Sequence, residues 1–195
     1  IIVANTLKER SIKQQAAEGE FYKELSRKDG LTDLYNHRFF HQLLETELSR
    51  ADRYGRVVSL IMIDIDNFKR YNDSHGHPAG DLALRRLSKL LMDSSRSCDY
   101  VARYGGEEFA VIVPEVGTDS ARRMAERIRK LIDETPFEGE EVMTGASLTI
   151  SLGVATYPLQ ASGKCELIEA ADKALYQAKA SGRNQVVVFG EDLAH

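Results

Sequence analysis

The sequence contains no tryptophan, only two cysteines and four prolines, and no apolar run as long as a membrane span. The cysteines, Cys98 and Cys165, lack the spacing of a metal site, so we interpret them as structural thiols in a reducing cytoplasm. The chain also lacks an excess of basic residues, because its formal net charge is -4. A nucleic-acid coat would be basic. We therefore expect a cytoplasmic segment that contacts neither nucleic acid nor a membrane, although a local basic pocket for a nucleotide is compatible with this charge.

The residues that are present are those of an ordinary globular chain. Of 195 residues, 43% are apolar and 29% are charged, which is typical of a soluble domain with a sizeable core. This length fits one domain with an appendage. Because the sequence starts with Ile1 rather than methionine, we interpret it as a fragment of a longer protein.

Residues 1–28 predict a projecting helix. They contain no proline and a single glycine, and they are rich in Lys, Glu, Gln and Ala. Apolar residues fill half of a heptad frame, which favours a weak coiled coil. A helix this polar has little core to pack on, so we expect it to connect an upstream module to the domain that follows. The alternative is a frayed leader without a function.

The rest of the chain interleaves helical and strand patterns without an internal repeat. Near-continuous apolar residues at 57–66 predict a strand that is buried on both faces and central in its sheet. Alternation at 148–154 predicts a half-buried strand, and 186–189 a final one. Helical spacing of apolar residues predicts four helices, within 39–54, 78–91, 121–132 and 167–178. This order predicts an α/β (α+β) fold, with a mostly antiparallel central sheet flanked by helices.

The stretch 103–109 joins two strand-like runs through Gly105 and Gly106. A Gly-Gly pair between such runs predicts a tight hairpin, whose primed turn needs positive φ at its central residues. Glu107 and Glu108 follow at once, and the glycines leave room for a ligand to approach the backbone. The stretch suits a divalent cation and a phosphate. The alternative is an acidic tip that keeps a sheet edge soluble.

A second pair of carboxylates, Asp64 and Asp66, ends the predicted central strand. A buried acidic residue is costly to desolvate unless it meets a cation or a helix N-terminus. At a strand end only one of the two need point at a site, and the alternative role is to cap the next short helix. Together with Glu107 or Glu108 they would supply hard oxygen ligands, which favour Mg²⁺ over Zn²⁺.

Groups that suit a nucleotide lie nearby. The segment 67–73 is expected to begin a short helix, whose first amides would cradle phosphates. Asn72 and Asp81 offer an amide and a carboxylate, and a carboxylate can accept from both N1–H and the exocyclic amine of guanine. Taken alone, each is equally a cap or turn residue. Lys179 and Arg183 end the last helix, where they either clamp terminal phosphates or complement the helix dipole.

Together these stretches resemble the GGDEF family, in its GGEEF form. The run GGEEF at 105–109 is similar to the family signature. Three further blocks resemble the family in the same order: DGLT at 29–32; DIDNFK at 64–69 with ND, GH and GD at 72–73, 76–77 and 80–81; and KASGRN at 179–184. The resemblance covers about residues 29–189. We place the family's domain at 29–190, with a tail at 191–195.

The resemblance implies a diguanylate cyclase, which condenses two GTP into cyclic di-GMP and releases two pyrophosphates. It implies a fold like the palm of adenylyl cyclases and polymerases. It also implies Mg²⁺, with Mn²⁺ as an alternative, held by Asp64 and Glu107 with the carbonyl of Ile65. Glu108 is implied either as a metal ligand or as the base near the 3′-hydroxyl. Because each domain binds one GTP, two domains must face each other as an antiparallel homodimer, under the control of an upstream sensor.

The resemblance also assigns residues to GTP and to the product. Those for GTP are the guanine readers Asn72 and Asp81, the backbone donors Phe68 and Lys69, the turn glycines Gly105 and Gly106, and the phosphate-holding Lys179 and Arg183. Arg96 and Asp99 resemble the RxxD site for inhibitory product, with Arg127 as its secondary arginine. A guanidinium can fork onto a phosphate, and we predict product inhibition. The alternative is a surface ion pair in a turn.

The sequence departs from the family pattern at two positions. Asp33 stands where the family often has glycine and His37 where it often has arginine, which puts local hinge or pairing details in doubt but not the chemistry.

Two other functions are alternatives to the cyclase. One other function is a catalytically silent receptor for GTP or cyclic di-GMP, which the retained acidic and guanine-reading residues disfavour. The other is a cyclase with a different product. Asp81 opposes it, because a carboxylate does not satisfy an adenine edge.

Overall fold

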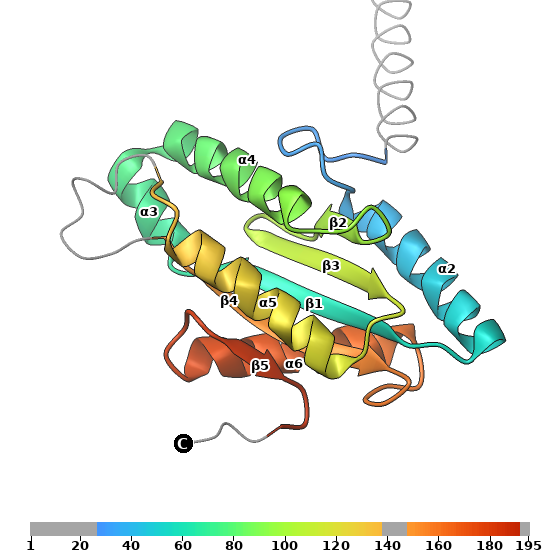
Figure 1. Ribbon diagram of the computed structural model, residues 1–195. Coiled ribbons are helices and arrows are strands. Elements are labelled where there is room, and N and C mark those ends of the chain that lie inside the picture. Colours follow the sequence, from blue (N-terminus) through green and yellow to red (C-terminus); the bar gives the residue numbers. More distant parts are fainter. Residues whose placement is uncertain (1–26, 138–147, 192–195) are drawn as a thin grey trace, which may run out of the picture.

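The computed structural model describes residues 27–137 and 148–191, which form a five-stranded sheet with helices on both faces (Figure 1). The strand order is β2-β3-β1-β4-β5, and only the β4–β5 pair is parallel. The elements are α2 (His37–Tyr54), β1 (Val58–Ile65), α3 (Phe68–His75), α4 (His77–Asp93), β2 (Tyr100–Arg103), β3 (Glu108–Pro114), α5 (Thr118–Asp133), β4 (Ile150–Tyr157), α6 (Lys164–Ala180) and β5 (Val186–Val188). The predicted mostly antiparallel sheet flanked by helices is confirmed.

Strand β1 is central because nearly all of its side chains are apolar. All eight of its residues are buried, as predicted. Ile61 and Ile63 join the core under α4 and α5, whereas Leu60 and Met62 join the core under α2 and α6. Since side chains alternate between the faces of a strand, Asp64 falls on the α6 side.

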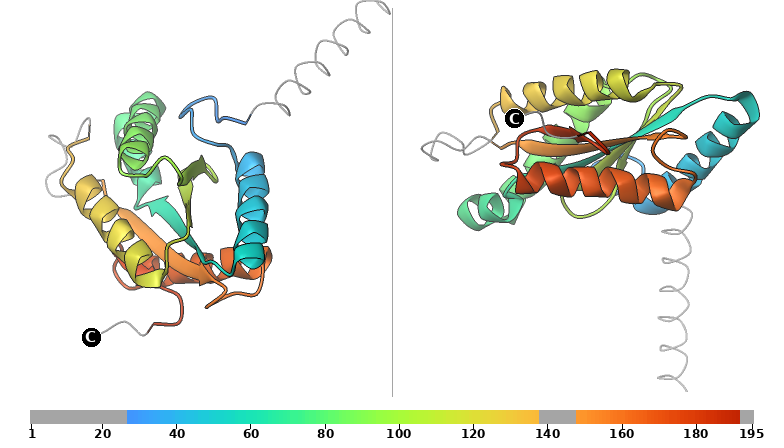
Figure 2. Two further views of the ribbon diagram at one scale, coloured as in Figure 1. Left: turned by 45° about the vertical axis from the view of Figure 1, so that its right-hand side comes forward. Right: turned by 90° about the horizontal axis from the view of Figure 1, so that it is seen from below.

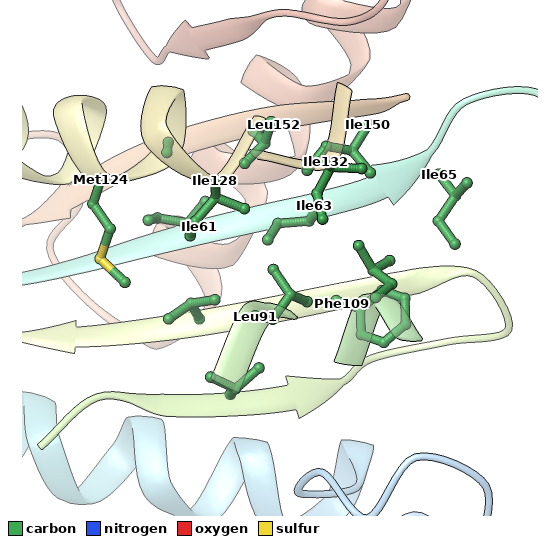
Figure 3. Packing of buried hydrophobic residues seen from close by; sticks show 14 of the residues in the cluster. Ile61, Ile63, Ile65, Leu91, Phe109, Met124, Ile128, Ile132, Ile150 and Leu152 are labelled. Atoms are coloured by element: carbon green, nitrogen blue, oxygen red, sulfur yellow. The ribbon is translucent and has the colours of Figure 1, made fainter. Parts of the chain in front are cut away.

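The helices form one layer on each face of the sheet. Figure 2 shows α2 and α6 on one side and α4 and α5 on the other. In Figure 3, Ile128 of α5 lies over Ile61 and Ile132 lies over Ile63, whereas Leu91 of α4 lies on the same side as Phe109. Each of these side chains is almost fully buried, which contributes roughly 1.5–3 kcal/mol apiece to folding.

The prediction of a half-buried strand at 148–154 is wrong, because β4 is buried on both faces. Its small residues are covered by α6 rather than by solvent. A Cβ added to Gly153 would lie 2.2 Å from the carbonyl oxygen of Ala171 and 2.2 Å from the backbone nitrogen of Leu175. The hydroxyl of Ser151 donates to Asp66. Alternation of large and small residues therefore reflects close packing here, not exposure.

Local signals place the helix ends as expected. The side chain of Asn36 accepts from the backbone N–H of Phe39 at 2.9 Å and begins α2. Helix α6 stops at Ala180, shortly before Gly182, whose φ is 119°. Asp33 adopts a φ of 56°, a conformation that glycine favours and aspartate tolerates better than most residues.

The remaining expectations concern the N-terminal segment, the two cysteines and membrane-spanning helices. The helix predicted for 1–28 lies almost wholly outside the described residues and stays a prediction. Cys98 and Cys165 are free thiols, as interpreted, but both are exposed and so do not pack in the core. Within the described ranges, no helix combines the length and apolar character needed to cross a membrane.

Candidate active site

The turn between β2 and β3 differs from the predicted hairpin. The backbone N–H groups of Tyr104 and Gly105 both donate to the carbonyl of Glu108, at 2.8 and 3.1 Å. Four residues therefore separate the strands, and neither Gly105 nor Gly106 has a positive φ. The predicted primed turn is wrong, because the longer loop closes without a left-handed residue.

The glycines instead provide space. A Cβ at Gly105 would lie 2.5 Å from Oε2 of Glu108, so this glycine leaves room for the Glu108 carboxylate. A Cβ at Gly106 would meet nothing within 4 Å, so the backbone there is open to a ligand. The expectation that the glycines leave room at the turn is thus consistent with the geometry.

Three predicted carboxylates meet where β1 ends. Asp64 lies opposite Glu108 in the β1–β3 register. The N–H of Ile65 donates to the carbonyl of Glu107 at 3.3 Å, which ties the turn to the end of β1. Asp64 is only 6% exposed. The cluster therefore combines a buried strand end with a more open turn.

The electrostatics of this cluster favour a cation. Burial raises the pKa of Asp64, and the carboxylates of Glu108 and Asp66 act in the same direction, whereas the hydrogen bond and charge of Lys179 lower it. Burial also raises the pKa of Glu107, reinforced by the charge of Asp64. Nζ of Lys179 lies 2.7 Å from Oδ2 of Asp64, so an ammonium partly neutralises the cluster.

The donor set fits Mg²⁺ better than a softer metal. Among the described residues, no three or more His, Cys, Asp or Glu side chains are grouped as a complete metal cage. Mg²⁺ does not need one, since it is usually held by one or two carboxylates together with substrate phosphates. Asp64, Glu107 and the carbonyl of Ile65 are hard oxygen donors of this kind.

Asp66 does not join the carboxylate cluster as a ligand. Its Oδ2 accepts from the hydroxyl of Thr149 at 2.8 Å and from the N–H of Asn184 at 3.0 Å, and its Oδ1 accepts from Ser151 at 2.7 Å. It does not cap α3 either, because no side chain caps that helix. Asp66 is a structural residue that anchors β4 and the loop after α6.

Helices α3 and α4 carry the predicted guanine readers. Oδ1 of Asn72 is buried and has no hydrogen-bond partner in the described part of the chain. Leaving such a group unpaired costs about 1–3 kcal/mol, so a bound donor would stabilise it. A Cβ at Gly80 would lie 1.8 Å from this oxygen, which shows that Gly80 makes the space that Asn72 occupies. Asp81 follows on α4 and is exposed.

The predicted phosphate-binding groups lie in three different settings. Phe68 and Lys69 begin α3, where no side chain bonds to the first amides, so these amides are suited to an anion. Lys179 lies in the carboxylate cluster. Arg183 is exposed, with a φ of 66°, and the structure does not bring its side chain to the carboxylates.

Two further residues belong to this region and were not predicted. Burial raises the pKa of Asp172 on α6, and the charge of Glu108 adds to the effect, so Asp172 lies near that carboxylate. Its place seven residues before Lys179, on the same helix face, was the available signal. Nη2 of Arg103 donates to the carbonyl of Gly106 at 2.7 Å, and its Nη1 lies 3.1 Å from Asp29. No local pattern indicated that link.

The predicted product site lies at the other end of β2. Arg96 and Asp99 form a turn before β2 rather than part of the hairpin strand, because the carboxylate of Asp99 accepts from the N–H of Arg96 at 2.8 Å. Arg96 lines a hollow of about 770 Å³ together with Arg123 and Arg127. A guanidinium nitrogen of Arg127 donates to the carbonyl of Ser94.

The chain is similar to known proteins in sequence and in fold. Residues 26–185 match the family described as diguanylate cyclase, GGDEF domain. The chain is 39% identical over 181 residues to Diguanylate cyclase DosC of Escherichia coli (strain K12), covering 89% of this chain and 38% of DosC. It is 42% identical over 167 residues to Response regulator PleD of Caulobacter vibrioides, covering 84% of this chain and 36% of PleD.

A solved structure is also similar. It contains the coiled coil and GGDEF domain of DgcB from Caulobacter crescentus in complex with c-di-GMP. The TM-score is 0.77 at 30% identity, covering 93% of this chain and 98% of that chain. By contrast, the chain spans less than two fifths of the length of DosC and PleD.

Proposed function

The chain belongs to the GGDEF family, and from that premise we propose that it is a diguanylate cyclase domain, which condenses two GTP into cyclic di-GMP and releases two pyrophosphates. One observation carries the proposal: Asp64, Glu107 and Glu108 converge where β1 ends. The relatives named diguanylate cyclase support it. Because they are longer proteins, the assignment to this segment rests on its own residues.

In this proposal Asp64 and Glu107, with the carbonyl of Ile65, hold Mg²⁺. The bound ion would neutralise the α-phosphate and lower the pKa of the attacking 3′-hydroxyl. Glu108 either adds a ligand or accepts the proton of that hydroxyl. Oxygen O3′ then forms a bond to the α-phosphorus, and pyrophosphate leaves.

The remaining residues orient GTP. Asn72 and Asp81 would bind the guanine edge, and the amides of Phe68 and Lys69 would bind phosphate oxygens. Lys179, now on Asp64, would turn to the terminal phosphates with Arg183. The open backbone at Gly106 and the space at Gly105 would allow the nucleotide to lie against the turn.

Ring closure requires a second domain, because one domain supplies one GTP. We propose an antiparallel homodimer, whose geometry would be set by the helix predicted for residues 1–28 and by an upstream sensor. The contact of Arg103 with both Asp29 and Gly106 supports such a connection, because it joins the start of the domain to the catalytic turn.

The test is direct. The purified chain is incubated with GTP and Mg²⁺ at high protein concentration, and products are identified by mass. Cyclic di-GMP and pyrophosphate are the expected products. GTP binding without any cyclic di-GMP would contradict the enzyme proposal and favour the receptor function.

The space beside Asn72 offers a specific prediction. Gly80→Ala should displace the Asn72 side chain and raise the KM for GTP by roughly 10–100-fold, since one buried hydrogen bond is worth about 1–3 kcal/mol. Steady-state kinetics would measure this change. Gly117→Ala is the control, because a Cβ there meets nothing within 4 Å. Equal KM values for the two variants would contradict the role of Asn72.

Product inhibition gives another prediction. Arg96→Ala should raise the inhibition constant for cyclic di-GMP at least about tenfold, because a charged hydrogen bond to phosphate contributes about 1.5–3 kcal/mol. Activity without product should not change. Arg122→Ala is a matched control, since Arg122 is paired with Glu191 and does not line the Arg96 hollow. An unchanged inhibition constant for Arg96→Ala would exclude the site.

A further inference from the structure

The first turns of α2 carry two histidines on one face. His37 and His41 are four residues apart, which places their side chains one above the other on a helix. Their Nε2 atoms lie 3.3 Å apart, and the ring planes meet at 72°. The reaction proposed above uses neither imidazole, so the pair calls for a separate explanation.

The separation of these nitrogens matches the distance between two ligand atoms on a tetrahedral metal ion. Zinc binds imidazole nitrogen at about 2.0–2.1 Å, so two nitrogens on one tetrahedral zinc are about 3.3–3.4 Å apart. Without an ion, one ring must present N–H and the other a lone pair at this distance. An ion would take the place of that proton at Nε2, and the proton would move to Nδ1 of the same ring, so both imidazoles would bind the ion in their neutral form.

The surroundings leave the pair accessible. His37 is exposed and His41 is half-buried. His41 borders two hollows of about 600 and 720 Å³, and the nearby cation, Lys164, is paired with Glu45. Across the described ranges, no third protein ligand completes a cage, so two positions on the ion would hold water or a small ligand.

We propose that His37 and His41 form a two-imidazole site for a divalent transition-metal ion, and that Zn²⁺ fits it best. Nitrogen ligands select this class of ion, whereas the carboxylates at Asp64 favour Mg²⁺. The site borders the catalytic turn, because the ring of Tyr104 lies 4.7 Å from that of His37 and Tyr104 directly precedes Gly105.

Calorimetric titration with Zn²⁺ tests the proposal, in saturating Mg²⁺ so that the carboxylates do not compete. We expect one site per chain. His37→Gln or His41→Gln should weaken it at least tenfold, since loss of even a group that supports a ligand costs ~10–100-fold. His77→Gln is the matched control and should bind as the parent does. Equal binding by the His37→Gln/His41→Gln double variant, or no binding by the parent at micromolar Zn²⁺, would overturn the site.

A second measurement uses the parent chain alone, so it does not depend on whether the variants fold. The chain has five histidines, and NMR resonances of their imidazoles can be followed during Zn²⁺ addition. Two of them, His37 and His41, should shift together at one equivalent. Shifts confined to other histidines, or none at all, would overturn the proposal.

Discussion

Asp64→Asn is expected to reduce cyclic di-GMP synthesis about a thousandfold or more, while leaving the metal-free fold at least as stable as the parent. The loss corresponds to about 4 kcal/mol of transition-state stabilisation, as expected when a carboxylate that holds the catalytic ion is removed. The fold should not suffer, because burial raises the pKa of Asp64 and so disfavours its charged form despite Lys179. A neutral amide avoids that penalty.

Two measurements check this prediction together. Initial rates of product formation give the loss of activity, and thermal unfolding with and without Mg²⁺ gives ion binding. Mg²⁺ should raise the midpoint temperature of thermal unfolding of the parent but not that of Asp64→Asn. Glu169→Gln, which neutralises an exposed carboxylate paired with Lys173, should behave as the parent in both assays. Substantial activity in Asp64→Asn would remove Asp64 from the metal site.

Gly153→Ala should lower the free energy of unfolding by about 4 kcal/mol or more, a large share of the about 5–15 kcal/mol that stabilises an ordinary domain. The added methyl carbon would overlap the backbone of α6 at Ala171 and Leu175. Backbone atoms cannot move aside as a flexible side chain can, so β4 and α6 would have to separate. That separation would open the core between them.

Urea unfolding, or the soluble yield if the variant does not fold, measures the effect. Gly163→Ala is the control, because a Cβ there meets nothing within 4 Å and its φ is -173°. Ala171→Gly should not rescue Gly153→Ala, since the overlap is with the Ala171 carbonyl oxygen rather than its methyl group. Wild-type stability of Gly153→Ala would contradict the close β4–α6 contact.

Local patterns were sufficient for most of the framework. The apolar run at 57–66 identified the central strand, and helical spacing identified α2, α4, α5 and α6, because burial of one face is recorded in residue periodicity. The cap at Asn36 and the stop near Gly182 follow from short-range backbone chemistry in the same way. The ordered motif blocks likewise pointed to the carboxylates that meet at the end of β1.

The tertiary structure decided which groups the polar side chains contact, because residue periodicity shows only which face of an element is buried. Asp64 and Asp66 look equivalent in sequence, yet Asp66 is held by hydroxyl and amide donors on β4 and after α6, which leaves Asp64 with Lys179. Arg103 meets Asp29 across 74 positions of chain. Sequence alone determined which residues form strands, helices and motif blocks. The partner of each buried polar group was decided by sheet register and helix packing, because those partners come from segments far apart in the chain.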